Sequence, residues 1–539
     1  MLAGQSSLLV QDDEMDRKML SRRLRCKGDE VNRAHDGDRD GFALNRVICS
    51  LLLCLRINCL RPSNESDLLI WEIPVKIRTG GYAMSVALFS TPALPLDSGD
   101  ARRWEDEIVY VVIIEKFFDG DSANNIMRGR FLEGRERYEG GLWGGDLKGV
   151  IAKLDDVTDL GVTTLLLYPV MQNDESPVGK FLPTGYRPKD YEHVDKNFGD
   201  NATLRALVDA AHARKVHVIL DMPLAMPGFE HPFLVDPTKR DWFAASTEYG
   251  ARRWKVENPE VADYLIGVSK RWKERSGCDG FRLDSAHLQP VSFWKRFVAE
   301  LKSAPPREDF LLLPELTIIP RKIGEFVTEA GFDGAYDFSA MTVRDVFGKD
   351  EDVGKLSFIA KEAKQFYPSP RTMMAPIDNY ESAFTSIALE PKAKRTKLAL
   401  TYQLMLDRVP LLYAGNELGI ASHDVGAAFP ADRRDSSFLK DVKALIALRK
   451  REPPLRRGNF AEVLSRGAMY VFLRTLGDDR ILVVLNGSDK PKTFAMPIGD
   501  RAWRSYQLDD LIGGGVTKPA GSDAAIEVHA FGARIVRLR

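Results

Sequence analysis

Downstream of Glu105 the chain alternates short apolar stretches with amphipathic runs of helical period, and this alternation predicts a parallel α/β architecture. The candidate strands are Ile108–Ile114, Thr164–Tyr168, Val216–Asp221, Gly280–Asp284, Phe310–Glu315, Gly334–Phe338, Met373–Asp378 and Pro410–Tyr413. The helical runs between them include Leu147–Leu160, Ala202–Arg214, Pro259–Ser276 and Thr396–Leu406. Eight such units over about 345 residues are typical of a (β/α)₈ TIM barrel, whose active site lies at the carboxyl ends of the strands.

This alternation is interrupted in one place and stops in another, which divides the chain of 539 residues. Residues 227–258, between the third strand and its helix, are rich in proline and aromatic residues and predict a short excursion domain. A helix over 438–451 closes the barrel, and after Pro453 short strands separated by turns replace the helical period. We therefore expect an atypical N-terminal extension over 1–100, a barrel over 101–455 and an all-β sandwich over 456–539.

The N-terminal extension has a pattern of its own. Ser7–Glu14 is a short apolar strand that ends in an acidic pair, and a basic helical run follows it. This resembles the opening of a response-regulator receiver domain, in which two adjacent acids hold Mg²⁺ near a phosphoacceptor Asp. Asp67–Glu72 stands in place of the phosphoacceptor strand, but Glu72 replaces the Asp. Two interpretations stay open, a degraded receiver domain and an extension without function.

Charge, hydropathy and cysteine usage exclude several classes of partner. The formal net charge of −1 gives no electrostatic indication of a nucleic-acid ligand. The nearest approach to a membrane span, residues 47–60, is shorter than the ~20 residues required and contains Arg56 and Asn58. Five cysteines, of which only Cys278 lies in the barrel, argue against a disulfide framework and for a cytoplasmic chain. We expect neither nucleic acid nor a membrane as partner, and the sequence leaves the oligomeric state open.

Carboxylates end two adjacent predicted strands of the barrel. Arg282 and Asp284 are two residues apart on one strand, so their side chains point to the same face. We expect Arg282 to lower the pKa of Asp284 and to hold it ionised as a nucleophile. Glu315 ends the next strand, where partial desolvation raises a carboxyl pKa and suits a general acid. Such a pair is the apparatus of glycosidic bond cleavage; a buried ion pair and a strand-end capping carboxylate are the alternatives.

The order of motifs leads to a known family. Residues 105–539 resemble the α-amylase family of retaining glycoside hydrolases, and in particular its neopullulanase-like and maltogenic-amylase-like members. The segments that carry the resemblance are Trp143–Gly149, Gly185–Tyr191, Gly280–Asp284, Leu313–Glu315, Pro410–Glu417 and Leu445–Arg449. In the acid strand, Pro314 replaces the usual Gly.

The resemblance implies a role for individual residues. It implies Asp284 as the nucleophile, Glu315 as the acid/base and Arg282 as the partner of the nucleophile. It also implies Tyr186 as a platform on which a sugar ring stacks. His287 stands where the family often has Lys or His beyond the nucleophile, in reach of the leaving-group sugar, and a surface His at a helix start is the alternative.

The chain departs from the family at its sugar-binding positions. The third-strand motif, usually Asp-x-x-x-Asn-His, runs here from Asp221 to Met226, so that Met226 replaces the His. The seventh-strand motif, usually Asn-His-Asp, reads Asn379, Tyr380 and Glu381, which makes the third catalytic carboxylate one methylene longer. Met226 and Tyr380 cannot donate the imidazole hydrogen bonds that strengthen in the transition state and supply several kcal/mol. We expect these residues to line the sugar site and Glu381 to replace the third carboxylate imperfectly.

A loop after the first strand is rich in oxygen ligands at close spacing, which suits Ca²⁺. Neopullulanase-like members of the family carry a similar loop, joined by a Gly and an Asp of the Gly-Gly-Asp segment. The resemblance implies a structural calcium site formed by Asp119, Asp121, Asn124, Asn125, Gly144 and Asp146. An Asx-rich turn without metal is the alternative.

Together these features predict a cytoplasmic α-amylase-family enzyme of carbohydrate metabolism. The expected reaction is cleavage or transfer of α-glucosidic bonds in maltooligosaccharide or α-glucan substrates by a retaining mechanism with two carboxylates. A catalytically impaired α-glucan-binding or regulatory barrel is the alternative. The altered positions 226, 380 and 381 favour this alternative, and the intact set of Arg282, Asp284 and Glu315 opposes it.

Overall fold

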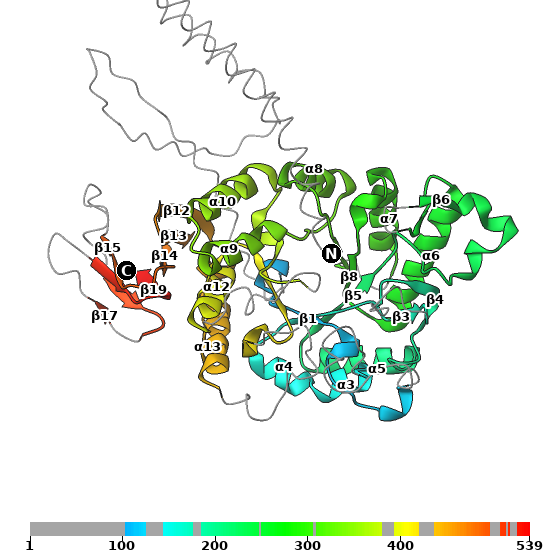
Figure 1. Ribbon diagram of the computed structural model, residues 1–539, viewed down its shortest axis with the longest axis horizontal. Coiled ribbons are helices and arrows are strands. Elements are labelled where there is room, and N and C mark those ends of the chain that lie inside the picture. The colour runs from blue at the N-terminus through cyan, green and yellow to red at the C-terminus, as the bar shows by residue number, and fades with distance from the viewer. Residues whose placement is uncertain are drawn as a thin grey trace, which may run out of the picture. The chain divides into compact units, whose positions relative to one another are not determined.

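The computed structural model describes residues 103–125, 144–175, 185–246, 250–305, 309–379, 393–419, 436–495, 507–513, 516–517 and 525–539 (Figure 1). The proposed receiver segment within residues 1–100 lies outside this part of the chain, as do Tyr380 and Glu381. Among the described helices, none combines the length and the apolar character of a membrane span.

A parallel sheet of seven strands forms the centre of the barrel, in the order β10-β11-β1-β2-β5-β8-β9. The strands are β1 Val109–Val112, β2 Thr164–Leu167, β5 His217–Met222, β8 Gly280–Leu283, β9 Leu311–Pro314, β10 Met374–Pro376 and β11 Val409–Tyr413. Every residue of β1, β2, β8 and β11 is buried, as expected for a parallel sheet that is covered on both faces. The predicted TIM-type fold is therefore confirmed.

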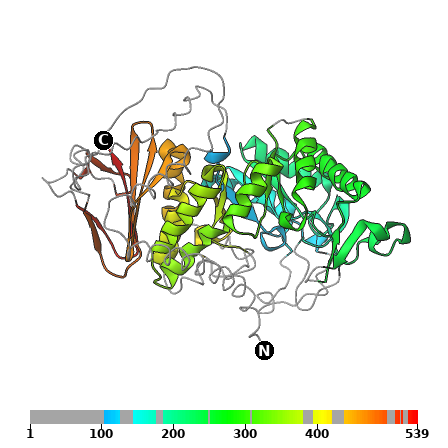
Figure 2. The ribbon, with the colours of Figure 1, turned by 90° about the horizontal axis from the view of Figure 1, so that it is seen from above.

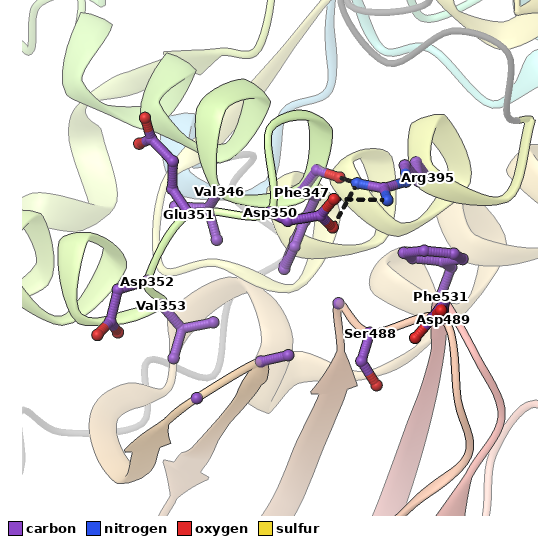
Figure 3. A pocket seen from close by; sticks show the side chains of 13 residues that line it. Val346, Phe347, Asp350, Glu351, Asp352, Val353, Arg395, Ser488, Asp489 and Phe531 are labelled. Atoms are coloured by element: carbon purple, nitrogen blue, oxygen red, sulfur yellow. Dashed lines mark hydrogen bonds and ion pairs between the residues drawn. The ribbon is translucent and has the colours of Figure 1, made fainter.

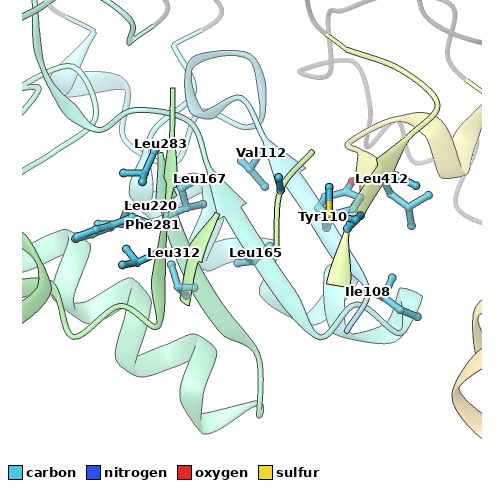
Figure 4. Close-up of a cluster of buried hydrophobic side chains, with 14 of the residues drawn as sticks. Ile108, Tyr110, Val112, Leu165, Leu167, Leu220, Phe281, Leu283, Leu312 and Leu412 are labelled. Atoms are coloured by element: carbon cyan, nitrogen blue, oxygen red, sulfur yellow. The ribbon is translucent and has the colours of Figure 1, made fainter. Parts of the chain in front are cut away.

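Side chains of successive strand residues enter two different cores. Ile108, Tyr110 and Val112 pack in the layer between sheet and helices, whereas Val109 and Val111 face the interior of the barrel (Figure 4). In β8 it is Phe281 and Leu283 that face the helices (Figure 4). Because strand side chains alternate, the residue between those two points into the barrel. That residue is Arg282, and the same alternation turns Asp221 of β5 inward.

The sixth predicted strand, 334–338, is reduced to a single β-bridge. Tyr336 pairs with Met374, and backbone hydrogen bonds join this segment to both edges of the sheet: Tyr336 donates to Pro314 of β9 at 3.3 Å, and Asp337 donates to Met374 of β10 at 2.7 Å. The Asp337 carboxylate ends the extended segment, because it accepts the Ser339 N–H at 3.2 Å and starts a 3₁₀ helix, η9 (Phe338–Thr342).

Helices follow the strands in the predicted order. They are α3 Leu147–Ala152, α4 Leu154–Leu160, α5 Asn201–Ala213, α6 Pro259–Ser276, α7 Val291–Ser303, α8 Pro320–Ala330, α9 Val343–Gly348, α10 Gly354–Phe366, α12 Ala393–Met405, α13 Ser437–Arg451 and α14 Pro453–Arg457. The single helix predicted over 147–160 is broken at Lys153 into α3 and α4. Asp200 and Asn258 cap the starts of α5 and α6 with side-chain oxygens, and Gly277 ends α6 in the left-handed conformation.

Two short hairpins extend the carboxyl side of the barrel. The first, β3 (Met171–Asn173) with β4 (Pro188–Val194), was not predicted from the sequence. The second, β6 (Phe243–Ser246) with β7 (Arg252–Trp254), lies in the segment between β5 and α6, together with the 3₁₀ turns η6 (Pro232–Leu234) and η7 (Pro237–Trp242). Trp254 is fully buried at the centre of an aromatic cluster there.

The C-terminal domain is antiparallel. Its main sheet has the order β12-β13-β14-β19-β16-β17, and β15 pairs with β18 in a second sheet. The strands are β12 Asn459–Arg466, β13 Met469–Leu476, β14 Asp479–Asn486, β15 Lys492–Ala495, β16 Leu508–Asp510, β17 Val516–Thr517, β18 Ala525–Val528 and β19 Gly532–Leu538. The expected all-β domain is confirmed, although β16, β17 and β19 were not among the predicted strands.

The buried Arg474 fastens this domain to the barrel, which the domain adjoins along α12 and α14 (Figure 2). Arg474 of β13 donates to the carbonyls of Met405 at 2.7 Å and Leu455 at 2.9 Å. Arg449 of α13 also donates to the Leu455 carbonyl, at 3.0 Å. Burial without a carboxylate bonded to either guanidinium lowers the pKa of Arg449 to about 9 and that of Arg474 to about 10.

Candidate active site

Four charged side chains meet at the carboxyl ends of three adjacent strands. Asp221 comes from β5, Arg282 and Asp284 from the end of β8, and Glu315 from the residue after β9. In the sheet register Asp221 lies beside Arg282, which places both in one layer of the barrel interior. This is the end of a TIM barrel at which active sites are built.

Arg282 is the centre of the cluster. Its Nη1 donates to the two oxygens of Asp221 at 2.8 and 2.7 Å and to Asp284 Oδ1 at 2.8 Å. Its Nη2 lies 2.7 Å from Glu315 Oε1. One guanidinium, with its side chain 4% exposed, therefore contacts all three carboxylates. Because both carboxyls contact the same guanidinium, the distance between them is limited to the width of that group plus two hydrogen bonds.

The residue after Asp284 holds Glu315 from a strained backbone conformation. Ser285 has φ 46°, in the left-handed region that non-glycine residues seldom adopt. In this conformation its N–H donates to Glu315 Oε2 at 3.1 Å, so that each oxygen of Glu315 has a partner. Backbone strain that positions an acid side chain is typical of functional sites.

The charge balance of the cluster corrects the pKa predicted for Asp284. Burial raises the pKa of Asp284 well above its usual range; Arg282 lowers it, and the neighbouring Glu315 and Asp221 raise it further. The predicted lowering was therefore wrong in sign, because burial outweighs the effect of Arg282, whose one guanidinium is shared among three carboxylates. Burial likewise raises the pKa of Asp221 to about 6. A cluster with three acids and one cation favours retention of a proton, and a general acid needs one.

The raised pKa of Asp221 makes the free energy of unfolding depend on pH. The folded value of Asp221, about 6, lies above the unfolded value of 3.8, so its stabilising contribution is complete below the unfolded pKa and is lost as the pH rises through the folded one. Asp221→Asn is expected to remove up to about 1.4 kcal/mol per pH unit from the slope of unfolding free energy between about pH 4 and pH 6. Urea unfolding across this range measures the slope. The exposed control Asp209→Asn should leave the slope unchanged. If Asp221→Asn also left it unchanged, the raised pKa of Asp221 would be contradicted.

Tyr186 and His287 lie close to the cluster in different ways. The Tyr186 hydroxyl donates to Asp221 Oδ2 at 2.7 Å, and the Tyr186 ring lies 5.6 Å from the Arg282 guanidinium. Its predicted stacking against a sugar stays a prediction. His287 lies in the 3₁₀ turn after Asp284, where Nε2 is 3.2 Å from Thr317 Oγ1, and burial lowers its pKa.

The remaining predicted sugar contacts are described only in part. Asn379 is half-buried and follows β10. Met226 is also half-buried, and its backbone carbonyl accepts the Tyr191 hydroxyl at 2.9 Å. The roles predicted for Tyr380 and Glu381 fall outside the described residues, so the position of the third catalytic carboxylate stays a prediction.

The sequence analysis did not predict that Asp221 belongs to the candidate site. Asp221 is 1% exposed and, through two hydrogen bonds from Arg282, fixes the guanidinium that contacts the catalytic pair. Tyr336 adds a ring 5.5 Å from the same guanidinium. The signal for Asp221 was present, because it ends an apolar strand in the same way as Asp284 and Glu315.

The six predicted calcium ligands are brought together, with Asp146 at the centre of the loop. Both of its oxygens accept N–H groups, among them Gly149 N at 2.6 Å and Asp121 N at 2.8 Å. The amide of Asn124 donates to Asp146 Oδ2 at 3.1 Å, while Asn124 Oδ1 is buried without a hydrogen-bond partner in the described chain. A side chain at Gly144 would collide with Asn125, since its Cβ would lie 2.4 Å from Asn125 Oδ1.

The loop also shows contacts that would compete with a metal. Asn125 Nδ2 donates to Asp119 Oδ2 at 2.8 Å, and Lys148 pairs with Asp121 at 2.6 Å. The described part of the chain contains no cluster of three or more His, Cys, Asp or Glu residues arranged to hold a metal ion. A site here would therefore depend on amide and backbone oxygens as well as on carboxylates.

A TIM barrel with an Asp nucleophile candidate and a Glu acid candidate on neighbouring strands, joined by one arginine, has the arrangement that a two-carboxylate glycoside hydrolase requires. Comparison with known proteins agrees. Residues 111–251 match the family model of the alpha amylase catalytic domain, and residues 462–535 match that of the maltogenic amylase C-terminal domain. The chain is thus similar to an α-amylase catalytic domain in its barrel and to a maltogenic amylase C-terminal domain in its C-terminal sheet.

Relatives extend this similarity over most of the chain. Neopullulanase 2 of Thermoactinomyces vulgaris is 27% identical over 76% of this chain and 74% of its own length. A cyclomaltodextrinase of Bacillus sp is 28% identical over 74% and 76%, respectively. Among solved structures, the α-amylase of Geobacillus thermoleovorans in complex with acarbose has a TM-score of 0.72 and is 28% identical over 81% of this chain and 99% of its own.

Proposed function

We propose that the protein cleaves or transfers α-glucosidic bonds of maltooligosaccharides or related α-glucans by a retaining mechanism. The observation that carries this proposal is the contact of one Arg282 guanidinium with both Asp284 and Glu315. The shared guanidinium holds the two carboxyls at one site, as the nucleophile and the acid of a two-carboxylate mechanism require. The names of the relatives, neopullulanase and cyclomaltodextrinase, support α-glucans as the substrate class.

The geometry assigns one task to each carboxyl. The reaction starts from the state in which the proton retained by the cluster is on Glu315 and Asp284 is ionised; Asp284 attacks the anomeric carbon while Glu315 gives this proton to the glycosidic oxygen, which leaves with the aglycone. Glu315, now ionised, then takes a proton from water, and the hydroxide attacks the glycosyl–Asp284 ester to release the sugar. Transfer to a sugar hydroxyl in place of water gives transglycosylation. Ser285 and Arg282 keep Glu315 in position through both steps.

The substituted sugar-binding positions support a slow enzyme more than an inactive one. Met226 cannot donate the hydrogen bond that the family's His gives to a sugar hydroxyl, so part of the transition-state stabilisation is lost. The cluster of Arg282, Asp284 and Glu315 is complete, however, and a barrel used only for binding would not need a shared proton beside a nucleophile.

The cysteine content of the chain supports a cytoplasmic location.

The test of the proposed function is the stereochemistry of the product. Purified protein is incubated with maltoheptaose, and the first anomer released is identified by proton nuclear magnetic resonance, with total reducing sugar measured in parallel. We expect the α-anomer first, in an amount that is lost in Asp284→Asn. Release of the β-anomer first would rule out retention, and equal release by both proteins would rule out Asp284 as the nucleophile.

We further propose that the loop around Asp146 holds a structural Ca²⁺. The buried and unpartnered Asn124 Oδ1 supports this, as does the close approach of Gly144 to Asn125. Asp119, Asp121 and Asp146 would supply charge, and Asn124, Asn125 and the Gly144 carbonyl neutral oxygens. The ion would fix the start of α3 beside the first strand and take no part in bond cleavage.

Calcium binding predicts a shift in thermal stability. A ligand present at 100 times its Kd stabilises the folded state by about 2.7 kcal/mol, so chelation with EDTA should lower Tm by several degrees and added CaCl₂ should restore it. Asn124→Ala is expected to lose most of this response, whereas Ser122→Ala, an exposed neighbour in the same loop, should keep it. Equal Tm values in EDTA and CaCl₂ would mean that the loop is an Asx-rich turn.

A further inference from the structure

One buried amide side chain ties the turn after the nucleophile candidate to the excursion between β5 and α6. Gln289 follows the 3₁₀ turn η8 (Ala286–Leu288) and is 2% exposed. Its Nε2 donates to the carbonyl of Ala225 at 3.1 Å and to that of Trp254 at 3.0 Å. Ala225 lies just before the excursion and Trp254 near its end, so a single amide group holds both ends of the excursion against the turn.

Arg253 of β7 completes this contact. Its Nη1 donates to the carbonyl of Leu288 at 2.6 Å and to Gln289 Oε1 at 3.3 Å. Both polar atoms of the Gln289 side chain are therefore hydrogen-bonded, as a buried amide requires. We call Gln289 and Arg253 the turn anchor.

The turn anchor is joined to a closely packed part of the excursion. Trp254 is fully buried, and the centre of its ring lies 4.8 Å from that of Phe243 and 5.2 Å from that of His231. The Trp254 N–H also donates to the Ala225 carbonyl at 3.2 Å, so the two acceptors of the Gln289 amide are bonded to each other. The turn after Asp284 is thus fixed to an aromatic core outside the barrel.

The other end of the same turn contains the strained residue of the candidate site. Ser285 has φ 46°, and its N–H donates to Glu315 Oε2 at 3.1 Å. Two backbone hydrogen bonds connect it with the turn anchor: the Leu288 N–H donates to the Ser285 carbonyl at 3.0 Å, and the Gln289 N–H donates to the Ala286 carbonyl at 3.1 Å. A left-handed residue other than glycine persists only where surrounding contacts determine its conformation, and the turn anchor supplies such contacts.

We propose that Gln289 is a positioning residue of the candidate active site, a role that rests on the proposed function of the barrel. With Arg253, it keeps the turn in the conformation that directs the Ser285 N–H toward Glu315. The hydrogen bond to Glu315 Oε2 then orients the acid for transfer of its proton to the glycosidic oxygen. Because Gln289 is buried, it acts through Ser285 and Glu315 and not by contact with the substrate. Its loss should therefore affect the step that needs the acid.

A comparison of two leaving groups tests this role. Gln289→Leu keeps the approximate size of the side chain and removes its N–H donors. We expect kcat/KM for maltoheptaose to fall about threefold to tenfold, the loss of roughly one hydrogen bond. The value for a maltosyl fluoride, whose leaving group needs no proton, should change by less than about twofold. Gln365→Leu, an exposed position of α10, is the control and should leave both values unchanged. Equal losses with the two substrates would overturn the proposal.

A second variant guards against a folding defect in Gln289→Leu. Arg253→Met removes one donor of the turn anchor from a side chain that is 27% exposed, and it should show the same selective loss with maltoheptaose. The matched control is Arg252→Met, at the preceding residue of the same strand, whose guanidinium lies 5.3 Å from the centre of the Phe243 ring. Activity of Arg253→Met equal to that of its control on both substrates would contradict the role of the turn anchor.

Urea unfolding tests the turn anchor without any need for turnover. Glycine adopts a positive φ without steric cost, so Ser285→Gly should raise the midpoint of unfolding of the otherwise unmodified protein. In Gln289→Leu the turn can relax, and the strain at Ser285 is then already relieved. The same substitution in that background should raise the midpoint less, or lower it.

Ser488→Gly is the control for the unfolding experiment. Ser488 lies in the turn after β14, at the cavity between the barrel and the C-terminal sheet (Figure 3), and its φ is not positive. Glycine at this position increases the conformational entropy of the unfolded chain and relieves no strain. The midpoint should therefore fall, and by the same amount in both backgrounds, because the two positions share no partner.

The outcomes separate this proposal from the proposed function. Equal shifts of Ser285→Gly in the two backgrounds would mean that Gln289 does not hold Ser285, and the proposal would be overturned even in an active enzyme. Unequal shifts in a protein that cleaves neither substrate would reject the proposed reaction and support the turn anchor.

Discussion

Replacing Asp284 by asparagine should reduce kcat for maltoheptaose by roughly 10⁴-fold or more, because removal of a nucleophile eliminates the covalent step and leaves only binding and electrostatic effects. The substitution keeps the size of the side chain, and the amide oxygen can still accept from Arg282. KM should change little. Steady-state kinetics with a reducing-sugar assay measure both values.

Comparison with Glu315→Gln separates the two carboxyls by role. A general acid matters most when the leaving group is poor, so the loss of kcat/KM, which reports the first step, should be severe in Glu315→Gln with maltoheptaose and much milder with a maltosyl fluoride, whose leaving group needs no proton. Asp284→Asn should be equally severe with both substrates. Similar losses for the two variants on both substrates would contradict the assignment, and a control substitution of the exposed Ser303 at the end of α7, Ser303→Ala, should behave as the unmodified protein.

Replacing Arg282 by methionine is expected to cost about 3–5 kcal/mol of stability, since it leaves buried carboxylates without their counter-charge. The sign of the pH dependence follows from the raised pKa of Asp221 and Asp284: the folded state binds their protons more tightly than the unfolded state, so the loss should be larger at higher pH. Urea unfolding at about pH 5 and about pH 8 measures both the loss and its pH dependence.

The control for this experiment is an arginine of similar charge outside the cluster. Arg321→Met on α8 removes an exposed guanidinium, 58% accessible, that makes only a surface pair with Glu325. Such pairs contribute at most about 1 kcal/mol. If Arg282→Met cost no more than this control, the cluster would not depend on its cation. A loss independent of pH would mean that the carboxylates are all ionised in the folded state.

The barrel could be predicted because its strands are buried on both faces, which produces continuous apolar runs that the sequence displays openly. The segment 334–338 has a similar run but forms only a bridge. Its Asp337 turns outward to Ser339, Tyr367 and the buried Arg408, and these contacts end the strand. The hairpin of β3 with β4 was missed because Met171–Asn173 is three residues long and pairs in an irregular register with a distant segment.

Part of the candidate site could be predicted from the local sequence, and part of it depends on residues that are distant in the sequence. The positions of Arg282, Asp284 and Glu315 follow from strand alternation and from the rule that barrel active sites lie at strand ends. The pKa of Asp284 does not, because its largest cause is burial in the folded barrel, followed by the charges of Arg282, Glu315 and Asp221. Asp221 is distant in sequence and becomes a neighbour only when β5 pairs with β8.

Arg474, between the barrel and the C-terminal sheet, bears on how such chains can be recombined. Its partners are backbone carbonyls, so a change of side chain on the barrel does not remove the acceptors. Arg474 reaches Met405 at the end of α12, Leu455 of α14 and Gly458 just before β12. A chimaera that joined this barrel to the sheet of a relative would have to import an arginine at position 474, or leave buried carbonyls without donors. The two domains are separate segments of the sequence, but in the folded protein they are joined by buried hydrogen bonds.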